Sequence, residues 1–285
     1  MRRRVLLQSA VAGSAAVMLR GQMAEAADDA GNFEGIIDSN VSLFHWPFRR
    51  LPLDKTEKLV AKLRSLGVTK ALAGSFEGVF HRDLASANAR LADECARYPE
   101  LTPIGSVSPS LPGWERDLDR CASKWRMPGI RLHPSQQGYA LDSTLFSRLL
   151  ARAAEAGVFV QLAVTLEDVR TQPALVVKPD VDLAPLADAM AKAPAAKVQL
   201  LNLRPRGSEL KSLATIPNLY FDTARADGTD GVASLLAVAG PERVVFGSHA
   251  PFLIPEAALI RVHESALDPN SLRTLLRGNA EGLLS

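Results

Sequence analysis

The fold is decided by an apolar run that reads GIIDSNVS at residues 35–42 and by seven similar runs that follow it. Each run is short and bounded by turn-forming residues, as expected for a buried strand. The later runs occupy residues 68–74, 101–107, 129–133, 158–164, 197–203, 219–223 and 243–249. Amphipathic helical segments separate the runs, and this alternation predicts an α/β fold with a parallel sheet. Eight units favour closure into a single (β/α)8 TIM barrel, and an open doubly wound sheet is the alternative.

The first 26 residues have the layout of a bacterial export signal. Arg2, Arg3 and Arg4 form a positive start, residues 5–19 are weakly apolar, and Ala24-Glu25-Ala26 offers a cleavage site. An Arg pair before Val-Leu-Leu-Gln indicates the twin-arginine type. A membrane anchor is the alternative, but the apolar run is shorter than the about 20 residues of a spanning helix. We therefore expect an exported, periplasmic protein without a stable membrane anchor.

Composition and charge predict one ordinary globular domain over residues 27–285. The chain has 33 basic and 31 acidic residues, and removal of residues 1–26 leaves 29 basic and 30 acidic ones. This balance gives no support to a nucleic-acid partner. Cys95 and Cys121 have no metal-like spacing, so we expect buried free thiols. The composition leaves a homo-oligomer open.

Four of the five histidines fall where the active face of a barrel forms. His133 ends the fourth run and His249 the eighth, while His45 and His81 follow the first and second runs. The carboxyl ends of the strands carry the active site in barrels of this kind. Arg131 lies two residues before His133 and so shares its strand face. Planar guanidinium groups bind carboxylates well, so Arg131 predicts a small, carboxylated substrate.

Loops at the same end of the barrel supply further candidates for substrate binding. Trp46 and Arg49 follow the first run, and Glu167 and Asp168 begin the long connection at residues 166–182. Long connections in compact domains are usually functional or mobile. This connection is interpreted either as a lid over the barrel mouth or as a surface excursion.

At these residues the sequence resembles the amidohydrolase-related branch of the amidohydrolase superfamily, whose members are metal-dependent TIM-barrel enzymes. The likeness rests on IID at residues 36–38, GIRLHP at 129–134, FGSHAPF at 246–252 and NAEGLL at 279–284. It spans the chain after the export signal. The resemblance implies hydrolysis or, as in some members, decarboxylation.

The resemblance also implies a metal site whose ligands this sequence lacks. That family binds a divalent metal through His-x-His on strand one, one His each on strands five and six, and Asp on strand eight. The corresponding residues here are Asn40, Ser42, Gln161, Asn202 and His249. Neutral amides and hydroxyls are poor ligands for zinc. We therefore predict no bound metal or other cofactor, with Asn40, Gln161 and Asn202 binding substrate or stabilising an oxyanion.

Three functions remain open on these residues. The first is a metal-independent hydrolase that acts on an ester, lactone or amide of a small acid. His249 would be its general base, with His133 or His81 assisting and Asp83 or Asp38 orienting a histidine.

The second is a metal-dependent hydrolase or decarboxylase with a relocated zinc site. Its ligands would be drawn from His45, His81, His133, His249, Glu167 and Asp168. The third is a non-catalytic ligand-binding barrel, because a fold alone does not guarantee activity.

Overall fold

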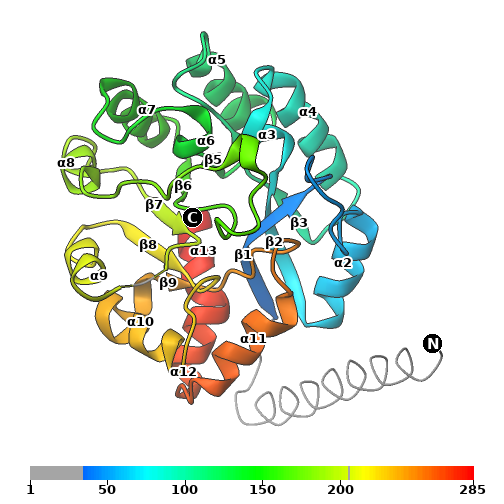
Figure 1. Ribbon diagram of the computed structural model, residues 1–285, viewed down its shortest axis with the longest axis vertical. Coiled ribbons are helices and arrows are strands. Elements are labelled where there is room, and N and C mark those ends of the chain that lie inside the picture. Colours follow the sequence, from blue (N-terminus) through cyan, green and yellow to red (C-terminus); the bar gives the residue numbers. More distant parts are fainter. Residues whose placement is uncertain (1–34, 205) are drawn as a thin grey trace.

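The computed structural model of the protein describes residues 35–204 and 206–285, and parallel strands surrounded by helices form its centre (Figure 1). The export signal predicted for residues 1–26 lies outside the described residues. Within the described residues, no helix is long and apolar enough to cross a membrane.

Nine strand segments follow one another around this centre within the described residues, and every neighbouring pair is parallel. They are β1 (Ile36–Leu43), β2 (Val68–Ser75), β3 (Leu101–Pro103), β4 (Gly105–Ser106), β5 (Gly129–Leu132), β6 (Phe159–Ala163), β7 (Val198–Leu201), β8 (Leu219–Asp222) and β9 (Val244–Val245). β3 and β4 are two halves of the run predicted at residues 101–107. Ile104 separates them, and its backbone N–H donates to the Ala73 carbonyl at 2.8 Å. The eight predicted strand positions are therefore confirmed.

Hydrogen bonds between the first strand and the last close the ring. The Ser39 backbone N–H donates to the Phe246 carbonyl, and the Ser42 N–H donates to the Ala250 carbonyl, each at 2.9 Å. Val41 and Ala250 form a parallel bridge between these donors. The fold is thus a (β/α)8 barrel, and the open doubly wound alternative is wrong.

Helices pack around the outside of the barrel and close its amino end, where the strands begin. The longer ones are α2 (Thr56–Ser65), α4 (Leu84–Cys95), α7 (Thr144–Glu155), α9 (Gly207–Leu213), α10 (Gly231–Ala239) and α11 (Pro255–Glu264). The shorter ones are α3 (Glu77–Phe80), α5 (Trp114–Asp119), η1 (Arg120–Lys124), α6 (Pro134–Gln137), η2 (Ala174–Val176), α8 (Leu186–Ala191), η3 (Pro241–Arg243), α12 (Pro269–Arg273), η4 (Thr274–Gly278) and α13 (Asn279–Leu284).

The sequence dictates which helix face meets the barrel, as α7 shows. Phe146, Leu149, Leu150 and Ala153 recur at helical spacing and are all buried. The Ser143 hydroxyl accepts the Phe146 backbone N–H at 3.2 Å and caps the first turn.

The amino end of the barrel is filled by apolar side chains. Ile37, Leu72 and Ile104 from the strands pack with Ala280 and Leu283 of α13. Because this end is sealed, only the opposite end, where the strands finish, is left to build a site.

The two thiols are free and buried, as expected. Burial raises the pKa of Cys95 and of Cys121 to about 12, so neither is a reactive thiolate at neutral pH.

Candidate functional site

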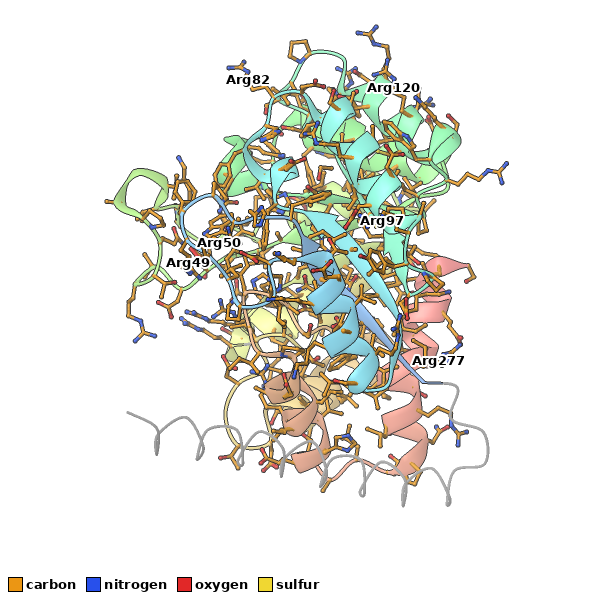
Figure 2. The ribbon with its side chains drawn as sticks, turned by 90° about the vertical axis from the view of Figure 1, so that its right-hand side faces the viewer. Arg49, Arg50, Arg82, Arg97, Arg120 and Arg277 are labelled. Carbon is orange, nitrogen blue, oxygen red and sulfur yellow. The ribbon has the colours of Figure 1, made fainter. Side chains whose placement is uncertain are left out.

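Buried polar side chains gather where the barrel strands end. They come from six of the eight strand positions, and each is less than 9% exposed. They are Asp38, Asn40 and Ser42 of β1, Arg131 of β5 with the following His133, Gln161 of β6, Gln199 of β7 with the following Asn202, Asp222 of β8, and His249 after β9. In Figure 2 the labelled side chains of Arg49 and Arg50 mark this end of the barrel, and Arg277 marks the other end.

A rigid amide and carboxylate network joins β1, β7 and β8. Asn40 Nδ2 donates to Asn202 Oδ1 at 2.8 Å and to Asp222 Oδ2 at 2.7 Å. The Asn202 backbone N–H donates to Asp222 Oδ1 at 3.0 Å, and its Nδ2 donates to the Thr165 carbonyl at 2.9 Å. A Cβ on Gly247 would lie 3.0 Å from the Asn40 Cβ, so glycine permits this close approach. Both amide hydrogens of Asn40 are therefore committed to protein acceptors.

Arg131 fills the barrel interior, and its guanidinium is held by the protein itself. Its acceptors are Gln161 Oε1 at 2.8 Å, the Val41 carbonyl at 3.0 Å, Ser42 Oγ at 3.1 Å and the Leu72 carbonyl at 3.3 Å. Gly74 leaves the space that the guanidinium occupies, because a Cβ there would lie 2.6 Å from Nη1. The structure therefore places Arg131, predicted as the carboxylate-binding residue, in a structural position.

The predicted substrate residue Gln161 is engaged in the same layer. Its Nε2 donates to the Ser39 carbonyl at 2.7 Å and to Gln199 Oε1 at 2.9 Å. Gln199 Nε2 in turn donates to Ser39 Oγ at 2.7 Å. With Oε1 accepting from Arg131, every polar hydrogen of the Gln161 side chain is committed within the protein.

Two carboxyl groups share the interior with the Arg131 cation. Burial raises the pKa of Asp38 to about 6, against the opposing hydrogen bonds from Ser248 and Asn40. Burial likewise raises the pKa of Asp222 to about 7. Asp38 Oδ1 accepts backbone N–H groups from Asn40 and Ser248, each at 3.0 Å, but Oδ2 has no partner among the described residues. Carboxyl groups that titrate near neutrality are typical of acid–base sites.

His249 is held in a fixed orientation with one free nitrogen. Its Nε2 lies 2.7 Å from the Leu166 carbonyl, and because a carbonyl can only accept, Nε2 carries the hydrogen. Nδ1 then bears a lone pair, which is buried without a partner in the described part of the chain. The backbone φ of +57° lies in the left-handed region, which histidine adopts more readily than most residues.

Both buried histidines are neutral at neutral pH. Burial lowers the pKa of His249 to about 3, and the nearby Arg225 and Arg131 add to this effect. Burial also lowers the pKa of His133 to about 3, and Arg131 and His249 contribute. His133 Nδ1, like His249 Nδ1, is buried with no partner among the described residues.

An aromatic wall borders His249 on one side. The Trp46 ring lies 4.9 Å from that of Phe252 and 5.4 Å from that of Phe76, measured between centroids. Phe252 lies 5.1 Å from the His249 ring. Trp46, a predicted substrate residue, therefore lies in a wall of the barrel mouth.

Glu167 and Asp168 both form ion pairs near this wall. The Arg49 guanidinium pairs with the Glu167 carboxylate and stacks over Phe252 at 5.6 Å. Burial raises the pKa of Glu167, and Arg49 opposes the shift. Asp168 accepts hydrogen bonds from Arg170 and from Arg204, which hold its pKa well below the usual range.

The long connection at residues 166–182 divides into two parts. Leu166 and Glu167 are buried, and Leu166 packs with Trp46 and Phe76. Residues 169–171 and 177–180 are exposed. Its start thus covers the barrel mouth, whereas most of its length is a surface excursion.

His81 and Asp83, both predicted in the catalytic set, lie at the protein surface. Asp83 caps α4 by accepting the Ser86 backbone N–H at 3.1 Å. His45 is also largely exposed and lies 3.9 Å from Asp54. The relocated metal set is therefore not brought together. In residues 35–204 and 206–285, no three His, Cys, Asp or Glu side chains are placed to hold a metal.

Sequence reasoning missed Asp222, Gln199 and Arg225. Asp222 is the one acidic residue in the run at 219–223 and stands near its carboxyl end, which was a usable signal. Gln199 is a polar residue inside another buried run. Arg225 follows its strand by three residues in a loop, and no pattern distinguished it from a solvated arginine.

Comparisons with known proteins agree with this architecture. The model of a family described as Amidohydrolase matches residues 47–285. No curated protein matches the sequence.

Among solved structures, 2,6-dihydroxybenzoate decarboxylase from Rhizobium superposes with a TM-score of 0.69 and 14% identity, covering 88% of this chain and 99% of that one. 5-Carboxyvanillate decarboxylase from Sphingomonas paucimobilis gives 0.68 and 15%, with 88% and 99% covered. Dihydroxybenzoic acid decarboxylase from Polaromonas sp. JS666, with bound manganese and the inhibitor 2-nitroresorcinol, gives 0.68 and 14%, with 88% and 97% covered. At these identities the likeness establishes the fold.

The strand-end residues of this chain do not fit a divalent metal. Manganese and zinc favour carboxylate and imidazole ligands, whereas Asn40 and Gln161 offer neutral amide oxygens, and that of Gln161 already accepts from the Arg131 guanidinium. His249 is the single good ligand among the five corresponding positions; its Nε2 is hydrogen-bonded to the Leu166 carbonyl, so it could offer a metal only the one nitrogen Nδ1.

Proposed function

Because the chain belongs to the amidohydrolase family, we propose that it is an enzyme whose own buried side chains transfer protons at the barrel mouth without a divalent metal. The observation that carries this proposal is a pair of unpartnered buried nitrogens where the strands end, Nδ1 of His133 and Nδ1 of His249, on two rings near enough for their charges to interact. Asp38 Oδ2 is likewise unpartnered, deeper along β1. Buried polar atoms are nearly always paired, so the two free nitrogens indicate where a reactant binds.

The reaction we propose is hydrolysis of an ester, lactone or amide of a small carboxylated substrate. His249 Nδ1 accepts a proton from water as the water oxygen forms a bond to the substrate carbonyl carbon. When the bond to the leaving group breaks, protonated Asp38 gives its proton to that group. Asp38 suits this role because its pKa is raised to about 6 and its Oδ2 is free of protein partners.

The basicity of His249 depends on what lies beside it. Burial is the main cause of its lowered pKa, and the positive charges of Arg225 and Arg131 contribute. An anionic substrate near Arg225 offsets that charge and raises the pKa of His249. The base therefore becomes stronger when the substrate binds.

Decarboxylation is the second candidate. Solved structures that share this fold are decarboxylases of hydroxylated benzoates. In this reaction the bond between the ring carbon and the carboxyl carbon breaks, carbon dioxide leaves, and protonated Asp38 supplies the proton that replaces it. The buried carboxyl group with a raised pKa favours this alternative.

A turnover screen on chelator-treated protein tests the proposal and separates the two reactions. Hydrolysis of esters and lactones that carry a separate carboxylate group releases acid, whereas decarboxylation of hydroxybenzoates releases carbon dioxide. We expect turnover to survive chelation, with far less than one equivalent of transition metal by elemental analysis. Activity that is lost on chelation and restored by manganese or zinc would overturn the proposal.

We also propose that the enzyme acts in the periplasm without residues 1–26, on the evidence of the twin-arginine pattern. Mass spectrometry of periplasmic material should show a chain that begins near residue 27. An intact Met1 on soluble exported protein would contradict this.

A further inference from the structure

A pocket of about 390 Å³ opens between α9 and α10. Its charged lining comes from Arg204 and Arg225, each three residues beyond the end of a barrel strand, and from Lys211 and Asp227. The pocket therefore lies beside the ends of β7 and β8, on the side of the barrel where the buried polar cluster lies.

Arg225 is a buried cation without a committed partner. It is 8% exposed, its Nε is buried without a hydrogen bond, and no described residue forms an ion pair with the guanidinium. Burial lowers the pKa of Arg225, and the charge of Arg204 adds to the effect. Arginine is rarely buried unless it is paired.

The acidic groups around Arg225 are engaged elsewhere. Asp227 pairs with Arg261, and Asp168 pairs with Arg170 and with Arg204. Asp222 accepts from the Asn40 side chain. Their charges raise the pKa of Arg225 from a distance, but none of the three forms an ion pair with it, and the pocket lining carries three cationic side chains against the one carboxylate of Asp227.

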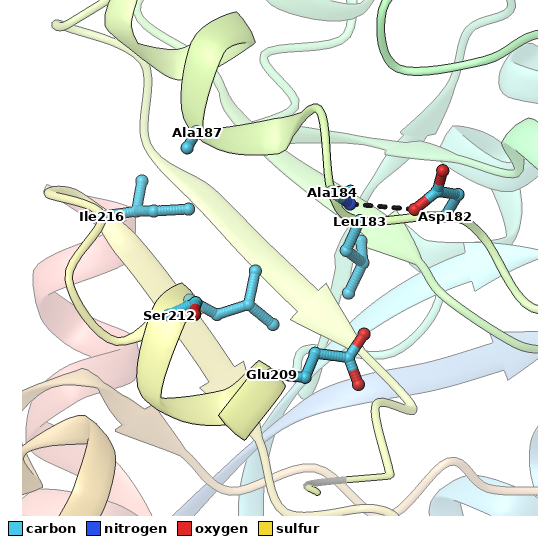
Figure 3. Close-up of a pocket in the computed structure, with 8 residues that line it drawn as sticks. Asp182, Leu183, Ala184, Ala187, Glu209, Ser212 and Ile216 are labelled. Atoms are coloured by element: carbon cyan, nitrogen blue, oxygen red, sulfur yellow. Dashed lines mark hydrogen bonds between the residues drawn. The ribbon is translucent and has the colours of Figure 1, made fainter. Parts of the chain in front are cut away.

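The pocket on the other side of α9 provides an internal contrast. It has a similar volume of about 380 Å³ and lies between α8 and α9. Figure 3 shows its charged groups, the carboxylates of Asp182 and Glu209. Two pockets of similar volume thus flank α9. Of these two, only the pocket next to Arg225 carries cationic side chains suited to an anion.

We propose that the pocket between α9 and α10 binds the anionic group of the substrate, a carboxylate or a phosphate, with Arg225 as its main cation and Arg204 beside it. The planar guanidinium matches the paired oxygens of either group. This deepens, and rests on, the proposed function: Arg225 lies three residues after Asp222 of the buried polar cluster, at the same end of the barrel as His249, and its charge acts on His249 and Glu167. Arg225 takes the role that the sequence suggested for Arg131.

Anion binding tests the proposal without turnover and so fails independently of the proposed reaction. Benzoate and inorganic phosphate are titrated by calorimetry at low salt into wild type, Arg225→Gln and Arg126→Gln. Arg126 is an exposed arginine for which the structure records no side-chain partner, and it serves as the matched control. We expect Arg225→Gln to weaken binding at least about tenfold, as for a lost charge-assisted hydrogen bond, with Arg126→Gln unchanged.

The outcomes are distinct. Tighter benzoate binding identifies a carboxylate subsite, and tighter phosphate binding identifies a phosphate subsite. Wild type that binds neither anion, or Arg225→Gln that binds as wild type does, overturns the proposal.

Thermal stability provides a second measurement. A buried charge that is paired only by a ligand destabilises the protein when the ligand is absent. The Arg225→Met variant should therefore melt at or above the wild-type temperature when no anion is present. Added anion should raise the melting temperature of wild type and not that of Arg225→Met. A variant that melts lower than wild type without anion would make Arg225 structural and overturn the assignment.

Discussion

Arg131 and Arg225 are both buried arginines near the carboxyl ends of barrel strands, yet their surroundings differ completely. Arg131 donates to four protein acceptors and shares the interior with Asp38 and Asp222. Arg225 has no hydrogen bond or ion pair within the described residues. Both side chains are largely buried, with Arg131 3% and Arg225 8% exposed, so the presence or absence of protein partners is what separates a structural arginine from one that awaits a ligand.

The same contrast separates the two layers of the polar cluster. In the layer of Arg131, Gln161 and Gln199, the amide hydrogens of Gln161 and the guanidinium find protein oxygens. At the mouth, the Nδ1 atoms of His133 and His249 find none among the described residues. The inner layer holds the strands together, and the outer one leaves nitrogens free for the proton transfers that we propose.

The largest effect expected at the mouth follows from His249→Asn. Asparagine tolerates the positive φ of this position, so the variant should fold. Loss of the general base should lower turnover of an identified substrate by about 10²- to 10⁴-fold. Circular dichroism checks the fold and steady-state kinetics the rate. Unchanged turnover in a folded variant would remove His249 from the mechanism.

The next largest effect should appear in the inner layer. Arg131→Met leaves Gln161 Oε1 and the buried acids without their cation, and such losses cost about 3–5 kcal/mol of folding free energy. Urea unfolding measures this difference. Arg225→Met is the matched control, since it removes the same charge from an unpartnered position and should not destabilise the protein. Equal losses in the two variants would abolish the distinction between the two arginines.

The sequence predicted the barrel better than it predicted the site. Strand positions follow from apolar runs, which are local and periodic, so all eight were found. The two-residue alternation along the first run placed Asp38 and Asn40 on one face, the end of the last run placed His249, and all three are buried in the polar cluster, while their predicted roles stay predictions. Whether a buried polar group has a hydrogen-bond partner, in contrast, depends on contacts between residues far apart in the chain, such as Arg131 with Val41. No local sequence pattern contains this information.

His81 and Asp83 illustrate the same limit. Like His45 after the first strand run, they follow a run and were expected at the barrel mouth, but all three are exposed, because whether a loop turns inward depends on tertiary packing. Here Leu84, directly after Asp83, is buried, and Asp83 itself caps the helix at the surface. Arg225 escaped notice for the converse reason, because a loop arginine is usually solvated.

A pH effect of intermediate size tests the raised carboxyl pKa values. The folded pKa of Asp38 is about 6, above its ordinary value, so the native state binds more protons than the unfolded chain between about pH 4 and 6. Its contribution to stability therefore falls as pH rises through that window. Asp38→Asn should gain stability relative to wild type, by about 3 kcal/mol at most between pH 4 and 7.5. Denaturant midpoints at these pH values measure the difference, and a pH-independent gap would contradict it.

The smallest expected effect comes from Gly247→Ala, which adds a Cβ beside Asn40 and Asp222 without removing a polar group. The new Cβ would lie 3.0 Å from the Asn40 Cβ and 3.1 Å from the Asp222 Cβ and Oδ2, so the two side chains must shift by a few tenths of an ångström. Overpacking of this kind costs about 1–3 kcal/mol. The control is Gly282→Ala in α13, where a Cβ meets nothing within 4 Å and alanine favours the helix by up to about 1 kcal/mol. If Gly247→Ala loses stability and also turnover while Gly282→Ala keeps both, the Asn40–Asp222 contact positions the reacting groups. If Gly247→Ala keeps full turnover despite its lower stability, that contact belongs with Arg131 among the residues that only hold the barrel together.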